Sequence, residues 1–482
     1  MKVLATTIHL LYFVSCSKIL TYCPSISKSH IHLCGKYADV LQTAGHDVVV
    51  FIPSYNKAID DFNGTKLAKV YRIKNIGLIE KTDELMKLKA YNFDMAITED
   101  IDFCNFGVIH HLEIKNVVLL SSEPLMDHVS EMFGVPSPYS YVPAMEENFL
   151  HDRMTFIERA QNTYKRLAAR YISYVIENKI TEVFREKFGQ EFPSMWEIAS
   201  NSSLVVVNTN ELFDLQRPIV HKTVFIGLIR DQENQIPPEN VNLFLDKSKK
   251  GTILISFGTV APFPHFPERI QLAFLHVILK FKNYHFIIKS LKGDTTTKKM
   301  FESVQNVDLL DWIPQTTLLE DSRVKLFVSH GGMNSVLESM EAGTPMLVIP
   351  VFTDQFRNGK NVERRNAGLA LLREQITNDT LEEHFSRLLE DDLYSATAKR
   401  LSSVMKDRPF SSEERLVKWI NFVLKYYPFD NFDVEGRNLS FVEYYLLDIA
   451  VTTLISLFAP MVLIFLIRKS FFIRELASVT TF

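Results

Sequence analysis

A histidine and two glycines in the second half of the chain have the types and the spacing of a diphosphate-binding turn. A mostly apolar strand, predicted over residues 325–328, ends at Ser329 and His330, and Gly331 and Gly332 follow. A helix is predicted to begin directly after them. Backbone N–H groups at the start of a helix have no internal partner and carry partial positive charge, so they suit phosphate oxygens. The glycines allow that backbone to approach a ligand closely, and the imidazole can donate a hydrogen bond to the same oxygens.

Polar residues after this turn are suited to the hydroxyls of a ribose and a sugar. Asn334 and Glu338 lie four residues apart in the predicted helix and share one face. A carboxylate on that face can accept hydrogen bonds from two ribose hydroxyls. Asp354 and Gln355 follow a second buried strand, predicted over residues 346–349. Ligands of α/β sheets lie beyond the carboxyl ends of the strands, so this position also favours ligand contact.

The pattern begins at Trp312-Ile313-Pro314-Gln315 and resembles the signature of the UDP-glycosyltransferases, which include the UDP-glucuronosyltransferases of the endoplasmic reticulum. The resemblance covers essentially the whole chain and is sharp only in the second half. It implies the α/β fold class GT-B, in which two Rossmann-like domains face each other across a cleft. By this resemblance, the UDP-sugar contacts come from Gly258, Thr259, Trp312, Gln315, Ser329, His330, Gly331, Gly332, Asn334, Ser335, Glu338, Asp354 and Gln355.

Three of these residues also have ordinary structural interpretations. In the family, the indole of Trp312 would stack on uracil. Taken alone, however, a tryptophan at this position could equally fill the hydrophobic core. Gly258 follows a predicted strand, where glycines are frequent in any fold. His330 could instead cap its own strand, although the adjacent glycines favour the phosphate role.

A base that removes the acceptor proton is required for sugar transfer to a hydroxyl, and histidine is the usual choice because its pKa is near neutral. His30 begins a helix predicted over residues 29–43, and the Gly45-His46 pair follows that helix. The family has a catalytic histidine at a similar offset from a Gly-His pair. His32 is a rival that would point elsewhere on the helix, and an ordinary structural histidine is the other alternative.

A base histidine needs an acidic partner that orients the ring and stabilises the imidazolium. The family places an aspartate at a fixed distance after a Phe-Asp pair, and here Phe93-Asp94 is followed by MAITEDIDF. The matching position holds Glu99, so this chain departs from the family, and the adjacent Asp100 is the alternative partner. The departure leaves open a non-catalytic, UDP-sugar-binding pseudo-enzyme.

The expected chemistry is an inverting transfer in which the UDP-sugar is a co-substrate and no cofactor takes part. The fold class implied by the resemblance does not require a catalytic metal, so we expect the transfer to need no metal. The sugar is glucuronate or glucose, and the expected acceptor is a hydroxyl of a small lipophilic molecule. A glycosyltransferase that builds a membrane glycolipid is a further alternative, and whether the chain forms a homo-oligomer stays open.

Composition excludes several other classes of protein. The chain has 482 residues, of which 46% are hydrophobic and 23% charged, so it can bury two sizeable cores. The formal net charge of −4 argues against a nucleic-acid partner. Four cysteines, one of them within the predicted leader, cannot form a disulfide scaffold.

Both ends of the chain carry targeting signals. Residues 3–14 are largely apolar and precede a small-residue cleavage site, which we place after Ser17. Residues 446–467 are apolar apart from Asp448 and are long enough to cross a bilayer. Arg468 and Lys469 follow and should stay cytosolic. These signals predict a single-pass type I protein with lumenal catalytic domains, and the family likeness indicates the endoplasmic reticulum.

The domain organisation follows from the alternation of strand-like and helical segments, which predicts parallel sheets. A polar segment ending in two prolines, residues 233–238, reads as the linker. We therefore expect a signal peptide (1–17), an acceptor-binding domain (18–235), a UDP-sugar-binding domain with closing helices (236–445), a transmembrane helix (446–467) and a cytosolic tail (468–482).

Overall fold

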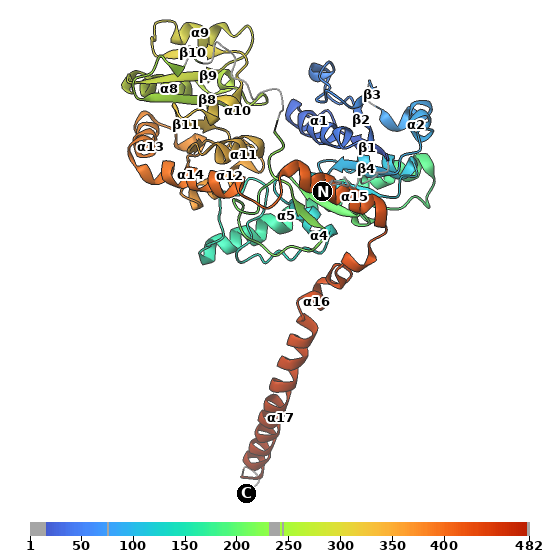
Figure 1. Cartoon of the computed structure of the whole chain (residues 1–482). Helices are drawn as coiled ribbons and strands as arrows, with labels where there is room; N and C mark the ends of the chain where they lie inside the picture. Colours follow the sequence, from blue (N-terminus) through green and yellow to red (C-terminus); the bar gives the residue numbers. More distant parts are fainter. Residues whose placement is uncertain (1–15, 75–76, 231–241, 243–244, 480–482) are drawn as a thin grey trace, which may run out of the picture. The chain divides into compact units, whose positions relative to one another are not determined.

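Runs such as VVVFIP and VVLLS in the first half of the chain are apolar on both faces, as is typical of strands covered by helices on both sides. A computed structural model describes residues 16–74, 77–230, 242 and 245–479 (Figure 1). The first half contains the strands β1 (Lys18–Tyr22), β2 (Asp47–Pro53), β3 (Lys69–Ile73), β4 (Met95–Glu99), β5 (Val117–Ser121), β6 (Leu204–Val207) and β7 (Thr223–Phe225). They form one parallel sheet in the order β3-β2-β1-β4-β5-β6-β7.

Helices connect these strands, as a parallel sheet requires. They are α1 (Lys28–Thr43), α2 (Thr82–Lys89), α3 (Cys104–His111), α4 (Asp127–Met132), α5 (Phe156–Phe188) and α6 (Met195–Ser200). The helix predicted over residues 29–43 is α1. Local signals fix the ends of the helices: α1 stops before Gly45, whose φ is +97°, and α5 starts with a capping box in which Thr155 and Glu158 bond each other's backbone N–H.

The second half repeats this architecture. Its strands are β8 (Gly251–Ser256), β9 (Tyr284–Lys289), β10 (Val307–Leu310), β11 (Val324–Ser329), β12 (Met346–Val348) and β13 (Gly368–Ala370), in the order β10-β9-β8-β11-β12-β13. All of its strand pairs are parallel. Its helices are α8 (Glu268–Lys280), α9 (Thr295–Phe301), α10 (Gln315–Glu320), α11 (Met333–Ala342), α12 (Gln355–Arg364), α13 (Asn378–Glu390), α14 (Asp392–Lys406) and α15 (Ser412–Tyr426).

The predicted pair of parallel sheets is therefore present, although four strands were not predicted. The short edge strands β3, β7 and β13 and the inner strand β1 were missed. β1 begins at Lys18, directly after the predicted cleavage site, and no strand was predicted there. The leader itself (1–15) and the predicted linker (233–238) lie outside the described residues.

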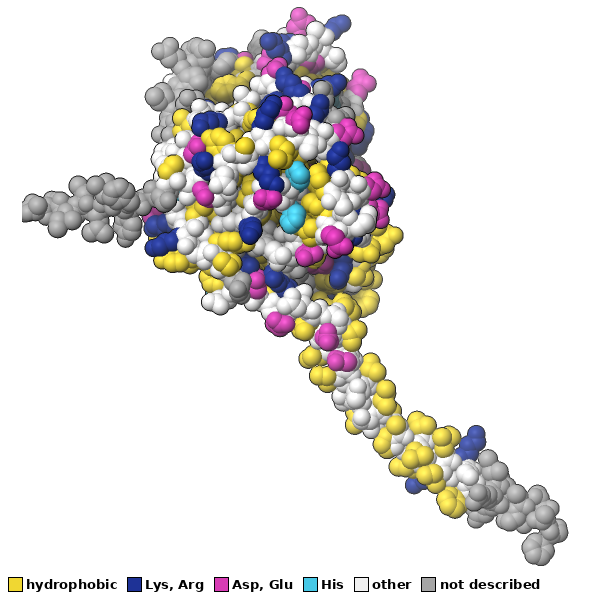
Figure 2. Space-filling view, turned by 90° about the vertical axis from the view of Figure 1, so that its right-hand side faces the viewer, with side chains coloured by type: hydrophobic (Ala, Val, Ile, Leu, Met, Phe, Trp, Pro, Cys, Tyr) yellow, Lys and Arg dark blue, Asp and Glu magenta, His cyan; other side chains and the backbone are white. Residues whose placement is uncertain are grey.

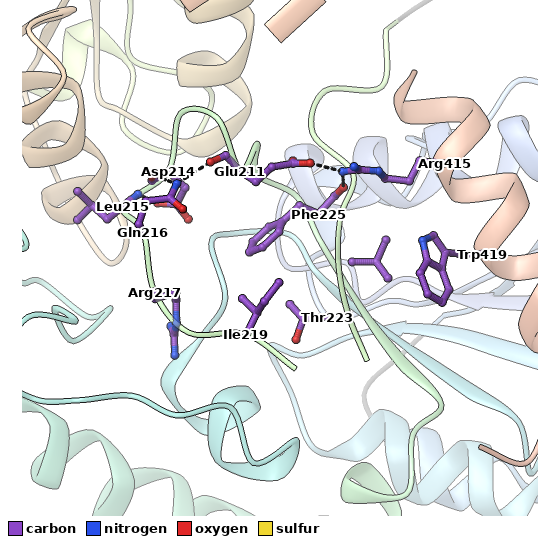
Figure 3. Close-up of a pocket in the computed structure, with 11 residues that line it drawn as sticks. Glu211, Asp214, Leu215, Gln216, Arg217, Ile219, Thr223, Phe225, Arg415 and Trp419 are labelled. Atoms are coloured by element: carbon purple, nitrogen blue, oxygen red, sulfur yellow. Dashed lines mark hydrogen bonds and ion pairs between the residues drawn. The ribbon is translucent and has the colours of Figure 1, made fainter. Parts of the chain in front are cut away.

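Helix α15 packs against the first sheet, although we had assigned it to the second domain. Leu416, Ile420 and Val423 on this helix belong to the buried cluster that contains Val206 and Val224. An amphipathic helix packs where its apolar face can be buried. The position of a helix in the sequence does not show which core that is. A pocket opens beside α15, where Arg415 pairs with Glu211 at 2.6 Å (Figure 3).

Residues 433–482 form a second compact unit. It contains α16 (Phe441–Tyr444) and α17 (Leu447–Val479), and within the described part of the chain α17 is the one helix that is long and apolar enough, over Leu447–Phe472, to cross a membrane. Hydrophobic side chains cover most of its drawn surface (Figure 2). The helix extends beyond the predicted end at residue 467, through Arg468 and Lys469, because backbone hydrogen bonding does not stop where an apolar run stops.

Candidate active site

The first group of candidate residues lies where the first sheet reverses its strand order. β1 and β4 are neighbours whose connections leave in opposite directions, and in such sheets ligands bind at the carboxyl ends of these strands. His30 lies in the first turn of α1, which follows β1, and Glu99 is the last residue of β4. His30 Nδ1 lies 2.9 Å from Glu99 Oε2, and the two side chains are 17% and 0% exposed. Two residues far apart in sequence thus form one hydrogen-bonded pair.

Glu99, rather than the alternative Asp100, makes this contact. Asp100 accepts a hydrogen bond from Ser121 Oγ at 2.7 Å. The rival histidine, His32, packs against Phe62 with ring centroids 6.2 Å apart. Ser122, which follows β5, is a further neighbour of the His30 ring: its hydroxyl oxygen lies 3.2 Å from His30 Nδ1. Sequence reasoning missed this residue, because no local motif marks it.

The electrostatics of this pair suit a base. Burial alone would lower the pKa of His30, but the charge and hydrogen bond of Glu99 outweigh burial, so the pKa lies above its ordinary value. Because Nδ1 faces the carboxylate, it carries the ring hydrogen in the neutral form. Nε2 is then the basic nitrogen of the ring.

The second group lies at the matching reversal in the second sheet, between the neighbours β8 and β11. A Cβ on Gly258, which follows β8 with φ +76°, would lie 3.0 Å from His330 Cε1, and a Cβ on Gly332 would lie 2.7 Å from His330 Nε2. The ring is thus held between two residues that must lack side chains. Burial, together with the positive charge of Lys289, lowers the pKa of His330 to about 4. The ring is therefore neutral at physiological pH, with one N–H and one acceptor nitrogen, and it hydrogen-bonds the backbone of Ser256.

The glycine turn itself has the predicted form. Gly331 has φ +86°, and a Cβ there would lie 2.5 Å from Val348 Cγ1. Gly332 is the N-cap residue of α11 and provides no side-chain cap, whereas Thr155 caps α5 and Ser411 caps α15. The first turn of α11 therefore offers uncapped N–H groups.

The residues predicted to bind the nucleoside are brought together on α10 and α11. Gln315 Nε2 donates to Glu338 Oε2 at 2.7 Å and to Ser335 Oγ at 3.2 Å. Trp312 is 62% exposed, so it is not a core filler. Sequence reasoning missed Lys289, which ends β9 and whose charge acts on both Glu338 and His330. A lysine at the end of a buried strand was the signal that could have revealed it.

Asp354 and Gln355 follow β12, as predicted, and differ in their surroundings. Asp354 is 5% exposed and accepts from Asn358 Nδ2 at 2.6 Å and from Thr353 Oγ1 at 3.2 Å. Burial raises the pKa of Asp354 to about 6, and its charge interacts with that of His30. Gln355 Oε1 instead accepts from two backbone N–H groups of its own loop. The side-chain oxygen of Gln355 therefore stabilises the loop.

Two further contacts join the halves beside these groups, and both were missed from sequence. Asn208, just beyond β6, donates to Asn334 Oδ1 at 2.9 Å. Arg357, three residues after Asp354, is 2% exposed and pairs with Asp214 at 2.8 Å, so it is a buried ion-pair residue and not a solvated helix residue.

Comparisons with known proteins identify the family to which this arrangement belongs. The family description "UDP-glucoronosyl and UDP-glucosyl transferase" matches residues 54–480. The chain is a member of the UDP-glycosyltransferase family. The "Putative UDP-glucuronosyltransferase ugt-50" of Caenorhabditis elegans is 44% identical to this glycosyltransferase, over 92% of this chain and 93% of the relative.

Solved structures identify the fold of the glycosyltransferase. The glycotransferase of kitacinnamycin superposes with a TM-score of 0.60 at 16% identity, covering 85% of this chain and 99% of that one. Phytolacca americana UGT2, complexed with UDP-2fluoro-glucose and pterostilbene, gives a TM-score of 0.58 at 15% identity, with 85% and 100% coverage. The predicted GT-B class is confirmed, and family membership makes the protein a UDP-sugar-dependent glycosyltransferase.

Proposed function

We propose that this glycosyltransferase transfers an uncharged hexose, such as glucose, from its UDP-sugar to a hydroxyl of a small lipophilic acceptor, with inversion and with His30 as the base. The observation that carries this proposal is the His30–Glu99 pair at 2.9 Å. It lies within electrostatic range of Asp354, a residue of the sugar-binding motif. A base and a sugar-binding carboxylate are thus neighbours.

In this mechanism the acceptor hydroxyl gives its proton to His30 Nε2 as its oxygen attacks the anomeric carbon. The bond from that carbon to the UDP oxygen breaks, and UDP leaves with the electron pair. Glu99 stabilises the imidazolium that forms. The His330 N–H and the first turn of α11 stabilise the negative charge that develops on the diphosphate. Thr259, which is exposed beside Gly258, would add a further donor.

The charges around the sugar motif support an uncharged donor sugar. Burial and the nearby carboxylates of Asp354 and Asp100 raise the pKa of Glu123 well above its ordinary value. A glucuronate carboxylate would add another negative charge to this group. Arg357, the cation closest to the motif in sequence, already pairs with Asp214. Bringing a further carboxylate beside Asp354 and Asp100 is costly, so an uncharged hexose fits this part of the site better.

A donor panel tests this choice. With membranes that contain the full-length protein and a phenolic acceptor, we expect UDP-glucose or UDP-galactose to give a kcat/KM at least about 10-fold above that of UDP-glucuronate, because one unpaired charge costs more than 1.4 kcal/mol. Product formation is measured by mass spectrometry. A preference for UDP-glucuronate would overturn the uncharged donor and leave the family assignment intact.

Two alternatives from the sequence remain distinguishable. The Glu99 substitution was the observation that favoured a pseudo-enzyme, and the hydrogen bond of Glu99 to His30 removes that support. A glycolipid-forming enzyme has the same donor site and differs only in its acceptor. A screen of phenols against lipid acceptors separates this alternative from the leading proposal.

We also propose that the protein is anchored in the endoplasmic reticulum membrane by α17, with residues 18–432 in the lumen. The polypeptide has Asn-x-Ser/Thr sites at exposed positions in this region, at Asn63, Asn201 and Asn378. We expect the protein from a eukaryotic membrane to lose apparent mass on endoglycosidase treatment, as glycans attach only in the lumen. Membrane-bound protein without any glycan, and cleaved by protease in intact vesicles, would indicate the opposite orientation.

A further inference from the structure

The carboxylate of Glu99 has a second partner, which the mechanism above does not use. Cys34 lies on α1, one turn after His30, and is fully buried. Its Sγ donates to Glu99 Oε1 at 3.2 Å, whereas the other carboxylate oxygen, Oε2, contacts His30 Nδ1. The carboxylate therefore bridges two side chains that project from the same face of one helix.

We propose that Cys34 is a positioning residue for sugar transfer: its thiol holds the Glu99 carboxylate against His30. The proposal rests on the proposed role of His30 as the base. This role of Cys34 also explains how Glu99 can stand where the family has an aspartate. A glutamate side chain has one more rotatable bond than an aspartate side chain and therefore needs a further contact to fix its carboxylate. Holding its second oxygen removes that freedom and fixes the first oxygen on the imidazole.

The surroundings of Cys34 fit a permanent donor. Glu99 is 0% exposed, and a buried carboxylate is stable in its ionised form only when donors surround it. Burial raises the pKa of the Cys34 thiol well above its ordinary value, so the sulfur keeps its hydrogen. The neighbouring Cys23 thiol, also buried, donates to the carbonyl oxygen of Thr21 at 3.8 Å. The side chains of Cys23 and Cys34 also hydrogen-bond each other, so both cysteines belong to one cluster beside Glu99.

A double-mutant cycle with Glu99 tests the proposal. Cys34→Ala is expected to lower kcat roughly 5- to 10-fold, since a hydrogen bond to a charged group is lost, with little change in the KM for the UDP-sugar. Cys34→Ser, which keeps a donor, should restore most of kcat. In a Glu99→Ala background, Cys34→Ala should have no further effect, because the residue acts only through the carboxylate. Cys104→Ala is the control, because this thiol interacts with Asp102, and its effect on kcat should be small and equal in both backgrounds.

The possible failures are distinguishable. An equal effect of Cys34→Ala in both backgrounds would show a purely structural role and overturn the inference, as would a failure of Cys34→Ser to restore kcat in a folded variant. Thermal unfolding of each variant measures the fraction of protein that is folded. If the fall in kcat is explained entirely by a smaller folded fraction, the inference is wrong. If Glu99→Ala itself leaves kcat unchanged, the proposed His30–Glu99 mechanism fails instead.

Discussion

Replacing His30 by alanine should slow sugar transfer about 10³-fold and leave UDP binding intact. A positioned general base contributes about 10²- to 10⁴-fold, so we expect kcat to fall by about 10³-fold. The affinity for UDP should be unchanged, because the residues predicted to bind the diphosphate belong to the second sheet, whereas His30 is on α1 beside the first sheet. Transfer rates and the calorimetric Kd for UDP measure the two effects separately.

The pH profile gives this prediction a second readout. Only neutral His30 can accept a proton, and its pKa is raised, so wild-type kcat/KM should rise with pH through a pKa above the ordinary value of about 6.5. This rise should be absent from the residual activity of His30→Ala. His32→Ala is the control and should keep both the rate and the profile, since that ring packs on Phe62. Transfer by His30→Ala at a wild-type rate would disprove the assignment of the base.

Replacing Gly331 by alanine should weaken UDP binding about 10- to 100-fold. The left-handed backbone at φ +86° disfavours any side chain, and the new Cβ would collide with Val348 at 2.5 Å. Strain of this kind costs about 1–3 kcal/mol. The turn relieves the strain by moving, and the N–H groups of α11 then no longer point at the diphosphate.

Gly293→Ala is the matched control for this variant. Gly293 lies in the same half of the protein with a similar φ of +82°, but the space around it is open. It should lower the stability a little and leave the calorimetric Kd for UDP unchanged. If Gly331→Ala bound UDP as tightly as the wild type, the turn after β11 would not be the diphosphate site.

The sequence predicted those parts of the site that are local in the chain. The turn at Gly331 and Gly332 and the helix after it depend on a few consecutive residues, so their pattern is visible without a structure. Glu99 was also located, but only by its offset from a family motif. What the sequence alone could not decide was whether Glu99 or Asp100 reaches His30. Adjacent residues at a strand end point in opposite directions, and the strand register decides between them.

The missed residues depend on strand order. Ser122 follows β5 and contacts His30, which follows β1, because β4 lies between β1 and β5 in the sheet. Lys289 ends β9, which is the neighbour of β8, and its charge acts on His330. Asn208 reaches Asn334 from the other half of the protein. Such contacts follow from the complete topology of both sheets. Because the sequence pattern left out β1, β3, β7 and β13, that topology could not be assembled in advance.

The return of α15 to the first sheet has a consequence for how this enzyme can diversify. The chain crosses from the first half to the second and back again, and Leu416 and Ile420 complete a core that was begun by β1 to β7. The two halves are consequently not separable cassettes. A recombination event at one crossover between them would join a new first sheet to a foreign α15, so exchange of the first half between relatives requires two crossover points.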